Sequence, residues 1–276
     1  KAESRGLGDV YKRQDFRYAR DMEQTVAEIM TPKEKLITVK EGESQDVVKS
    51  LMYKNRIEKV LILDDHNKLS GLITMKAIEK SIDYPLASRD SEGRLIVGAA
   101  LGVSSDLMER AEKLSAAGVD VFVLDSAHGD SEGVINAIKE VKKKFSKIEI
   151  IGGNVATAEG AKALIDAGVD AVKVGVGPGS ICTTRIIAGV GVPQLSAVLN
   201  VVQAAKDIPV ISDGGVRFSG DIVKAIGAGA DSVMLGSALA GTEEAPGEVE
   251  LYQGRSFKTY RGMGSIGAMS KRTDAN

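Results

Sequence analysis

Residues 148–175 read IEIIGGNVATAEGAKALIDAGVDAVKVG, two short apolar runs separated by a segment of alternating charge and alanine. The first run ends in Gly-Gly-Asn154, the middle segment covers Ala158–Ala167, and the second run ends at Gly175. An apolar run of strand length, a helical segment and a second apolar run predict a parallel strand-helix-strand unit.

The same unit recurs through the second part of the chain. Apolar runs ending in Gly, Asp, Ser or Asn predict six parallel strands at 95–101, 121–125, 148–154, 171–175, 210–213 and 232–236. Helical segments lie between them, for example at 106–117, 158–167 and 220–228, and three close on an Ala-Gly pair. Such repeats form either an open doubly wound sheet or a closed barrel.

Polar residues at the ends of the runs favour the barrel, because a barrel gathers all its strand ends around one mouth. These ends are Asp125-Ser126, Gly153-Asn154, Gly175–Gly177, Asp213–Gly215 and Gly236-Ser237. Six strands fall short of the eight that close a barrel. We therefore predict a TIM-type (β/α)8 barrel, over residues 85–276, from which two strands are absent; the resemblance described below implies that these are its first two strands.

A smaller α+β unit precedes the barrel. Residues 26–84 predict strands at 36–39, 59–63 and 71–74, a helix from Ser44 to Asn55 with Ser44 as its cap, and a final helix. So small a unit buries little surface and is expected to need a partner. Residues 1–14 show no apolar periodicity and are interpreted as a foreign or disordered leader.

Composition excludes several classes of function. The chain has 36 Lys and Arg against 38 Asp and Glu, a formal charge of −2, so it lacks the basic excess of nucleic-acid binders. No apolar run approaches the length of a membrane span, and no signal peptide opens the chain. One cysteine fits a reducing compartment. We expect a cytoplasmic protein that acts on small molecules.

The loop Gly175–Arg185, GVGPGSICTTR, holds this cysteine, Cys182. Glycines let the backbone approach a ligand closely, and the following threonines and Arg185 make a polar setting in which a cation favours the thiolate. Cys182 is therefore a candidate nucleophile. The alternative is an inert thiol, since free cysteine is commonly a small buried hydrophobe.

Two glycine turns follow the last two predicted strands, at Asp213-Gly-Gly215 and at Gly236-Ser237. Backbone N–H groups in such turns bind phosphate, and a neighbouring carboxylate suits ribose hydroxyls, so the pair predicts a nucleotide site. Plain turn geometry is the alternative for these glycines. Two His and one Cys cannot form a His/Cys metal cluster, whereas a hard cation held by loop carbonyls stays open.

Several motifs together resemble inosine monophosphate dehydrogenase, a family that shares its cysteine loop with guanosine monophosphate reductase. They are DSAHG (125–129), GGNVAT (152–157), GVGPGSICTTR (175–185), GVGVPQ (189–194), SDGG (212–215), GDIVK (220–224), VMLGS (233–237) and YRGMGS (260–265). The resemblance runs from about Asp15 to Met269. It identifies 26–84 as the second of two CBS repeats inserted in the barrel, and 15–25 as the end of the first.

The resemblance implies that Cys182 attacks C2 of inosine monophosphate, that NAD takes up a hydride, and that hydrolysis yields xanthosine monophosphate. Thr184 would touch the reacting centre. Residues implied in nucleotide binding are Ser180, Asp213, Gly214, Gly215, Gly236, Ser237, Tyr260, Arg261, Gly262, Met263 and Gly264. Residues implied on the nicotinamide side are Asp125, Ser126, Asn154, Gly175, Val176 and Gly177. Carbonyls implied in binding potassium are those of Gly177, Gly179 and Cys182.

The chain also departs from the family pattern. Relatives begin with two barrel strands and a complete first repeat, and they continue past Met269 into a flap whose Arg-Tyr pair supplies the base for hydrolysis. We therefore expect an internal fragment with impaired turnover. Nucleotide-binding CBS repeats carry Thr-x-x-Asp where this chain has Thr74-Met-Lys-Ala77, so adenine nucleotide binding there is not expected. The family implies a homotetramer.

Two other functions stay open. A reductase acting on guanosine monophosphate would be expected to lack the CBS insert, so residues 26–84 count against it. A catalytically dead regulatory protein built from a CBS repeat and a partial barrel is a third possibility, against which the retained Cys182 argues.

Overall fold

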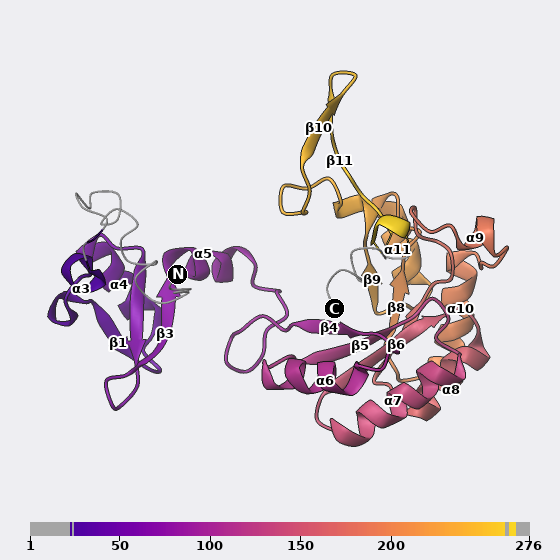
Figure 1. Cartoon of the computed structure of the whole chain (residues 1–276), viewed down its shortest axis with the longest axis horizontal. Helices are drawn as coiled ribbons and strands as arrows, with labels where there is room; N and C mark the ends of the chain where they lie inside the picture. Colours follow the sequence, from indigo (N-terminus) through magenta and orange to yellow (C-terminus); the bar gives the residue numbers. More distant parts are fainter. Residues whose placement is uncertain (1–22, 24, 263–264, 269–276) are drawn as a thin grey trace. The chain divides into compact units, whose positions relative to one another are not determined.

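The computed structural model describes residues 23, 25–262 and 265–268. Contacts within the chain divide it into two units, Lys1–Leu95 and Ile96–Asn276 (Figure 1). The predicted leader, 1–14, lies outside the described residues, as does the predicted repeat end at 15–25 apart from residues 23 and 25.

The first unit is a small α+β structure. Its elements are α3 (Val26–Ile29), a 3-10 turn (Lys33–Lys35), β1 (Thr38–Lys40), α4 (Gln45–Asn55), β2 (Lys59–Leu63), β3 (Leu69–Thr74) and α5 (Met75–Asp83). Strand β2 lies between β1, which is parallel to it, and β3, which is antiparallel. Val48, Met52, Val60 and Ile78 form a small buried core.

Side-chain caps begin both long helices of this unit. Ser44 Oγ accepts a hydrogen bond from Val47 N at 3.4 Å, which confirms the predicted cap of α4. Thr74 Oγ1 accepts one from Ala77 N at 3.0 Å at the start of α5. Thr74, part of the motif that departs from the nucleotide-binding CBS pattern, therefore satisfies an orphan donor of its helix.

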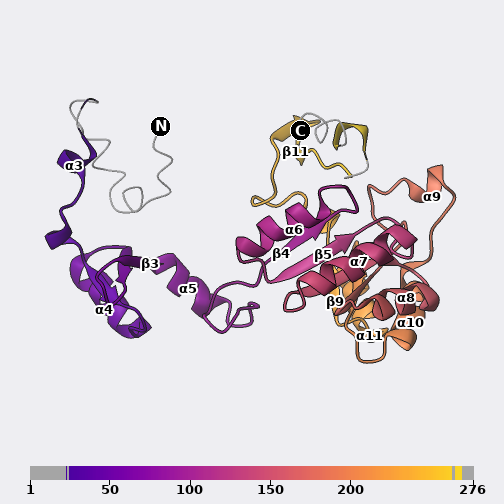
Figure 2. The same cartoon turned by 60° about the horizontal axis from the view of Figure 1, so that its bottom comes forward.

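The second unit is built on a six-stranded parallel sheet. Its strands are β4 (Gly98–Leu101), β5 (Val121–Asp125), β6 (Glu149–Val155), β7 (Ala171–Val174), β8 (Val210–Asp213) and β9 (Ser232–Met234). They pair in strict chain order from β4 to β9, and Figures 1 and 2 show the sheet curling as it goes. A doubly wound sheet reverses its order at a switch point, so the consecutive order supports the barrel type.

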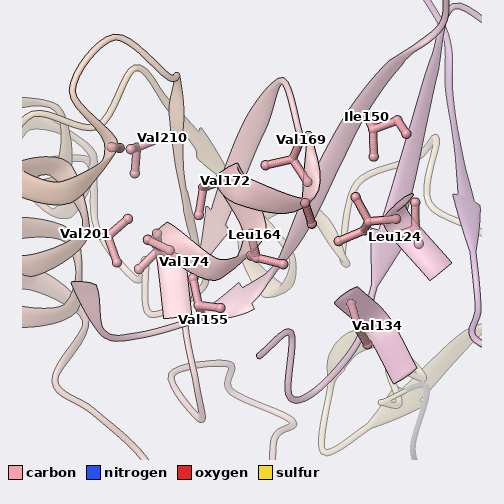
Figure 3. Close-up of a cluster of buried hydrophobic side chains, with 14 of the residues drawn as sticks. Leu124, Val134, Ile150, Val155, Leu164, Val169, Val172, Val174, Val201 and Val210 are labelled. Atoms are coloured by element: carbon pink, nitrogen blue, oxygen red, sulfur yellow. The ribbon is translucent and has the colours of Figure 1, made fainter. Parts of the chain in front are cut away.

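Helices between the strands cover the outer face of this sheet (Figures 1 and 2). They are α6 (Leu107–Ala116), α7 (Glu132–Lys144), α8 (Ala158–Ala167), α10 (Gln194–Ala205) and α11 (Ser219–Gly227). The short helix α9 (Thr184–Ile187) projects away from the sheet (Figure 1), with Ile186 and Ile187 exposed. A 3-10 turn follows β9 at Ser237–Leu239. Aliphatic side chains of strands and helices interdigitate in one core, shown in Figure 3 with Leu164 beside Val172 and Val174. The apolar side chains are buried in this core, and the polar residues lie at the carboxyl ends of the strands.

A repeated aspartate clamp joins neighbouring strands at their amino ends. Asp120, Asp170 and Asp231 each follow a helix end of sequence Ala-Gly-x. Each carboxylate accepts the backbone N–H at the start of the preceding strand, from Val97 at 2.8 Å, Ile150 at 2.7 Å and Val210 at 2.8 Å. Each aspartate N–H donates to the carbonyl of that same residue. The Ala-Gly pairs of the sequence thus mark positions where an aspartate joins the start of one strand to the start of the preceding strand by two hydrogen bonds.

Two strands were not predicted. Strands β10 (Val249–Tyr252) and β11 (Arg255–Lys258) form an antiparallel hairpin across the turn Gln253-Gly254, where both residues have positive φ. Both strands are largely exposed and only four residues long, so the alternation at Val249-Glu250-Leu251 is too short to indicate a strand by itself. The predicted strand at 95–101 is also shorter than expected, because its ladder to β5 begins only at Gly98.

Candidate active site at the carboxyl ends of the strands

A pocket of about 220 Å³ lies where β5, β6, β7 and β8 end. All of the residues predicted for the cysteine, the nicotinamide side and the cation line it, together with two of those predicted for nucleotide binding, Asp213 and Gly214. These are Asp125, Ser126, Asn154, Gly175, Val176, Gly177, Gly179, Cys182, Thr184, Asp213 and Gly214, with Ala127 and Pro178 completing the wall. The structure therefore brings together groups that lie up to 89 positions apart in the sequence, from 125 to 214.

Other predicted residues lie elsewhere. Gly215 lines a second pocket of about 140 Å³ that shares Gly214 with the first. Ser180, Gly236, Ser237, Tyr260, Arg261 and Gly262 line neither pocket. Met263 and Gly264 lie outside the described residues.

The chain segment 260–262 nevertheless reaches the neighbourhood of the cysteine loop. A Cβ on Gly236 would lie 2.7 Å from Tyr260 Oη, and one on Gly262 would lie 3.4 Å from Ile181 Cδ1. The phenol therefore packs directly on the turn after β9. Glycine at 236 makes this approach possible, because any side chain would displace the ring.

Cys182 sits in a tight turn between β7 and α9. Its N–H donates to the Gly179 carbonyl at 3.1 Å, and its Sγ lies 3.2 Å from Thr184 Oγ1. The thiol is half-buried and faces the pocket beside that hydroxyl. The thiol is therefore accessible and contacts a hydroxyl. This is the setting of a nucleophile, whereas a cysteine that only fills the core would be buried among apolar side chains.

Arg185 holds the far side of the same loop. Its guanidinium donates to the Val192 carbonyl at 2.9 Å, and its side chain packs so closely that a Cβ on Gly177 or Gly191 would lie within 2.9 Å of it. The guanidinium of Arg185, which the sequence suggested as the cation near Cys182, is thus hydrogen-bonded to a backbone carbonyl. It ties the segment before Cys182 to the start of α10.

Asn154 and Asp213 form a hydrogen-bonded pair across β6 and β8. Asn154 Nδ2 donates to Asp213 Oδ2 at 2.9 Å and to the Gly175 carbonyl at 2.8 Å. The register of β6 against β7 shifts between Gly153 and Val155, which leaves Asn154 out of the ladder at the pocket. Oδ1 of Asp213 has no hydrogen-bond partner among the described residues, and so it is available to a ligand.

Sequence reasoning missed Lys173, which lies beneath this pair. Lys173 is 2% exposed, and its Nζ contacts Asp125 Oδ1 at 2.9 Å, Asp213 Oδ2 at 2.8 Å and Asn154 Oδ1. The available signal was a charged residue in the middle of the apolar run AVKV. A lysine is almost never fully buried unless it is paired.

Gln194 was also missed as a support of the site. Its side-chain amide donates to the Val174 carbonyl at 2.9 Å and to Ser212 Oγ at 3.0 Å. It therefore joins the start of α10 to the ends of β7 and β8, from which Gly175 and Asp213 extend. Glutamine at the first position of a helix gives no sequence signal for such a contact.

The turn after β8 uses part of its backbone internally. Gly214 N donates to the Met234 carbonyl at 3.3 Å, so this N–H joins β8 to β9. Farther along, Asp221 Oδ2 accepts the N–H groups of Arg217 and Phe218, both at 3.0 Å. These two backbone hydrogen bonds hold the pKa of Asp221 below its usual range.

Within the described residues no group of three His, Cys, Asp or Glu side chains is gathered as a metal site, and no helix there is long and apolar enough to cross a membrane. The pocket combines a thiol, a carboxylate with a free oxygen and glycine backbone. That set can bind a polyhydroxylated ligand and attack an electrophilic carbon in it. Fold and pocket define the class: a parallel α/β protein of barrel type with its site at the carboxyl ends of the strands.

Comparison with known proteins places the chain within that class. A sequence model of the "IMP dehydrogenase / GMP reductase domain" matches residues 3–276. The chain belongs to this family.

Several curated relatives of the chain are dehydrogenases. The chain is 60% identical to inosine-5'-monophosphate dehydrogenase of Yersinia pestis and 59% identical to that of Escherichia coli K12, in each case over 93% of the chain and 53% of the relative. It is 52% identical to the Bacillus subtilis dehydrogenase. The chain spans about half the length of these relatives.

A solved structure also matches. It is that of GMP reductase C318A from Trypanosoma brucei in complex with guanosine 5'-monophosphate, with a TM-score of 0.82 and 48% identity over 95% of this chain and 55% of that one. A match this extensive includes most of the first unit. The expectation that a reductase lacks that unit does not hold for this reductase, so residues 26–84 do not distinguish the two activities.

Proposed function

We propose that the protein to which this chain belongs oxidises inosine monophosphate to xanthosine monophosphate with NAD, a step of guanine nucleotide synthesis. The observation that carries the proposal is the placement of the Cys182 thiol, the Thr184 hydroxyl and the Asp213 carboxylate around one pocket. Family membership and identity of up to 60% to curated dehydrogenases support it.

The chemistry follows from the thiol. Cys182 Sγ, as the thiolate, forms a bond to C2 of the hypoxanthine ring, and the C2 hydrogen leaves with its electron pair as hydride. The remaining thioimidate joins Cys182 to the purine. Water adds at C2, the C–S bond breaks, and the thiol is regenerated as xanthosine monophosphate forms. Two simpler steps thereby replace one direct displacement of hydride by water.

Residues around Cys182 orient the nucleotide. Asp213, with Oδ2 held by Asn154 and Oδ1 available, suits the two ribose hydroxyls. The glycine turns at Gly214-Gly215 and Gly236-Ser237, together with Ser180 and residues 260–264, are proposed to hold the phosphate and purine. Binding energy from these remote groups aligns C2 with the thiol.

The nicotinamide side is assigned to residues of the same pocket. Asp125, Ser126, Asn154 and the backbone of Gly175-Val176-Gly177 line it and would contact a planar amide ring. NAD, when bound, supplies the hydride acceptor. The proposed potassium site uses the carbonyls of Gly177, Gly179 and Cys182. Neutral carbonyl oxygens suit a hard cation, and the Gly179 carbonyl, which accepts from Cys182 N, keeps a second lone pair.

Reduction of guanosine monophosphate is the second candidate. The observation that favours it is the extensive match to the T. brucei reductase, which covers 95% of this chain. The higher identity to dehydrogenases, 60% against 48%, favours oxidation.

Substrate pairs separate the two activities. The folded chain is mixed with inosine monophosphate and NAD, or with guanosine monophosphate and NADPH, and reduced nicotinamide is followed by absorbance while nucleotides are separated by chromatography. We expect NADH with the first pair, at least one equivalent per Cys182. Cys182→Ser is the control and should give none. Consumption of NADPH with the second pair alone would overturn the proposal in favour of reduction.

Further proposals concern the whole protein. We infer that residues 26–84 form the second CBS repeat of an inserted pair, that the protein is a cytoplasmic homotetramer, and that its first barrel strands are contributed by sequence outside this chain. The exposed apolar side chains Leu251 and Tyr252 of the hairpin support self-association. Light scattering of the full-length protein tests the oligomeric state.

A further inference from the structure

Lys173 is a charged residue in a strand that is otherwise buried and apolar. Its neighbours Val172 and Val174 are both fully buried in the core between sheet and helices. Because side chains alternate along a strand, Lys173 projects from the opposite face, toward the inside of the curled sheet. A side chain that is 2% exposed there must find partners for its ammonium group.

Three partners meet this nitrogen, one from each of three other strands. They are Asp125 at the end of β5, Asn154 in β6 and Asp213 at the end of β8. An ammonium has three N–H donors, so the set is matched one to one. The nitrogen thereby joins the ends of strands that are not all adjacent in the sheet.

Every one of these partners lines the pocket, whereas Lys173 does not. Lys173 therefore acts on the pocket only through them. Its contact with Asp213 uses Oδ2, the same oxygen that Asn154 Nδ2 approaches, which leaves Oδ1 without a hydrogen bond to a described residue. Its contact with Asn154 uses Oδ1, which fixes the amide so that Nδ2 faces Asp213 and the Gly175 carbonyl.

Charge gives the arrangement a second consequence. Asp125 and Asp213 each lie within 2.9 Å of the same nitrogen, so their carboxylates are held within twice that distance of each other. Two carboxylates so close repel unless a cation lies between them. Lys173 is buried, whereas the side chains of Asp125 and Asp213 are 53% and 24% exposed. Removing the ammonium therefore leaves two carboxylates that face each other with only water to screen them, which is destabilising.

We propose that Lys173 is a positioning residue for the reaction: it holds the substrate-side carboxylate Asp213 and the cofactor-side carboxylate Asp125 in one fixed arrangement with Asn154. Its effect on nucleotide binding rests on the proposed function. Its coupling to the carboxylates does not, and the two are tested separately.

A double-mutant cycle in the chain without nucleotide measures the coupling. Lys173→Met should lower the melting temperature by about 5 °C or more. Asp125→Asn in the Lys173→Met background should recover part of that loss, because it removes one of the two facing charges. Additive effects of the two substitutions would overturn the coupling. If Lys173→Met does not fold, Lys173→Gln is used in the same cycle.

Titration calorimetry with inosine monophosphate tests the positioning. Lys173→Met should weaken binding by about 10-fold or more, and Lys173→Arg, which keeps the charge and donors, should recover most of it. The matched control is Lys142→Met. Lys142 lies 2.5 Å from Asp170 at the opposite ends of the strands, so its loss should lower the melting temperature and leave binding unchanged.

The outcomes separate the two proposals. Unchanged nucleotide affinity in a folded Lys173→Met variant would show that Lys173 is merely structural and would overturn the positioning role. Failure of the unsubstituted chain to bind inosine monophosphate would count against the proposed function, while the cycle would still decide whether Lys173 couples Asp125 to Asp213.

Discussion

A Cβ on Gly175 would lie 2.2 Å from the carbonyl oxygen of Asp213. Gly175 directly follows β7 with φ at 150°, and Asp213 ends the neighbouring strand β8. The two strand ends therefore approach more closely than any side chain permits. This contact sets the spacing between the loop that carries Cys182 and the carboxylate that is proposed to bind ribose.

Replacing Gly175 by alanine should separate these strand ends. We expect Gly175→Ala to lower the free energy of unfolding by about 3 kcal/mol, because the new methyl meets backbone that cannot move aside. Gly220→Ala is the matched control, since nothing lies within 4 Å of a Cβ there. Chemical denaturation of both variants checks the difference. Equal stability of the two would contradict the close contact.

The hydroxyl of Thr184 should matter for the reactivity of Cys182. Thr184→Val keeps the shape of the side chain and removes the oxygen that lies 3.2 Å from Sγ. We expect the nucleotide-dependent modification of Cys182 to slow by about 10-fold, the effect of losing one such hydrogen bond. Thr184→Ser should retain most of the rate. Quenched samples analysed by mass spectrometry give both rates, and identical rates for valine and serine would exclude a role for the hydroxyl.

The aspartate clamp between strands should contribute measurably to stability. Asp231→Ala removes the acceptor of the Val210 N–H, which is held at 2.8 Å. A buried donor left without a partner costs about 1–3 kcal/mol. Asp231→Asn keeps an acceptor oxygen and should lose less. Urea unfolding curves give the free energy of unfolding, which should be lowest for Asp231→Ala, higher for Asp231→Asn and highest for the unsubstituted chain. A reversed order would contradict the account.

Asp221 should stabilise the protein in a pH-dependent way. Two backbone N–H groups at the start of α11 hold its pKa below the ordinary value of 3.8. The folded state therefore favours the ionised form, so the stabilisation is complete above that ordinary value and is lost as the pH falls through the lowered pKa. The melting temperature of Asp221→Asn should lie below that of the unsubstituted chain at pH 7, and the gap should close in strong acid. A difference in melting temperature that grows as the pH falls would contradict this stabilisation by ionised Asp221.

The strands could be predicted because each is a short apolar run that ends in a polar or glycine residue. Since parallel strands end at the same edge, the convergence of Asp125, Asn154, Cys182 and Asp213 on one pocket also followed from the sequence. The six-strand count and consecutive order agree with that prediction.

Other features depend on tertiary contacts that no local pattern encodes. In the sequence, Lys173 is only a single charged residue inside an apolar run. Its three partners come from three other strands, so no local pattern reveals them. The strands of the hairpin β10–β11 are four residues long and largely exposed, so their sequence gives only a short signal. Tyr260 packs on Gly236 instead of lining the pocket, and this contact between residues far apart in the sequence has no local signal.

The intact mass of the chain after incubation with inosine monophosphate and NAD tests the central claim most directly. The account predicts an added mass equal to the purine nucleotide less two hydrogens, one lost from C2 as hydride and one from the thiol as a proton, localised to Cys182 by peptide mapping and absent in Cys182→Ser. A folded chain that binds the nucleotide, forms NADH and never carries the adduct, even in rapidly quenched samples, would contradict covalent catalysis by Cys182.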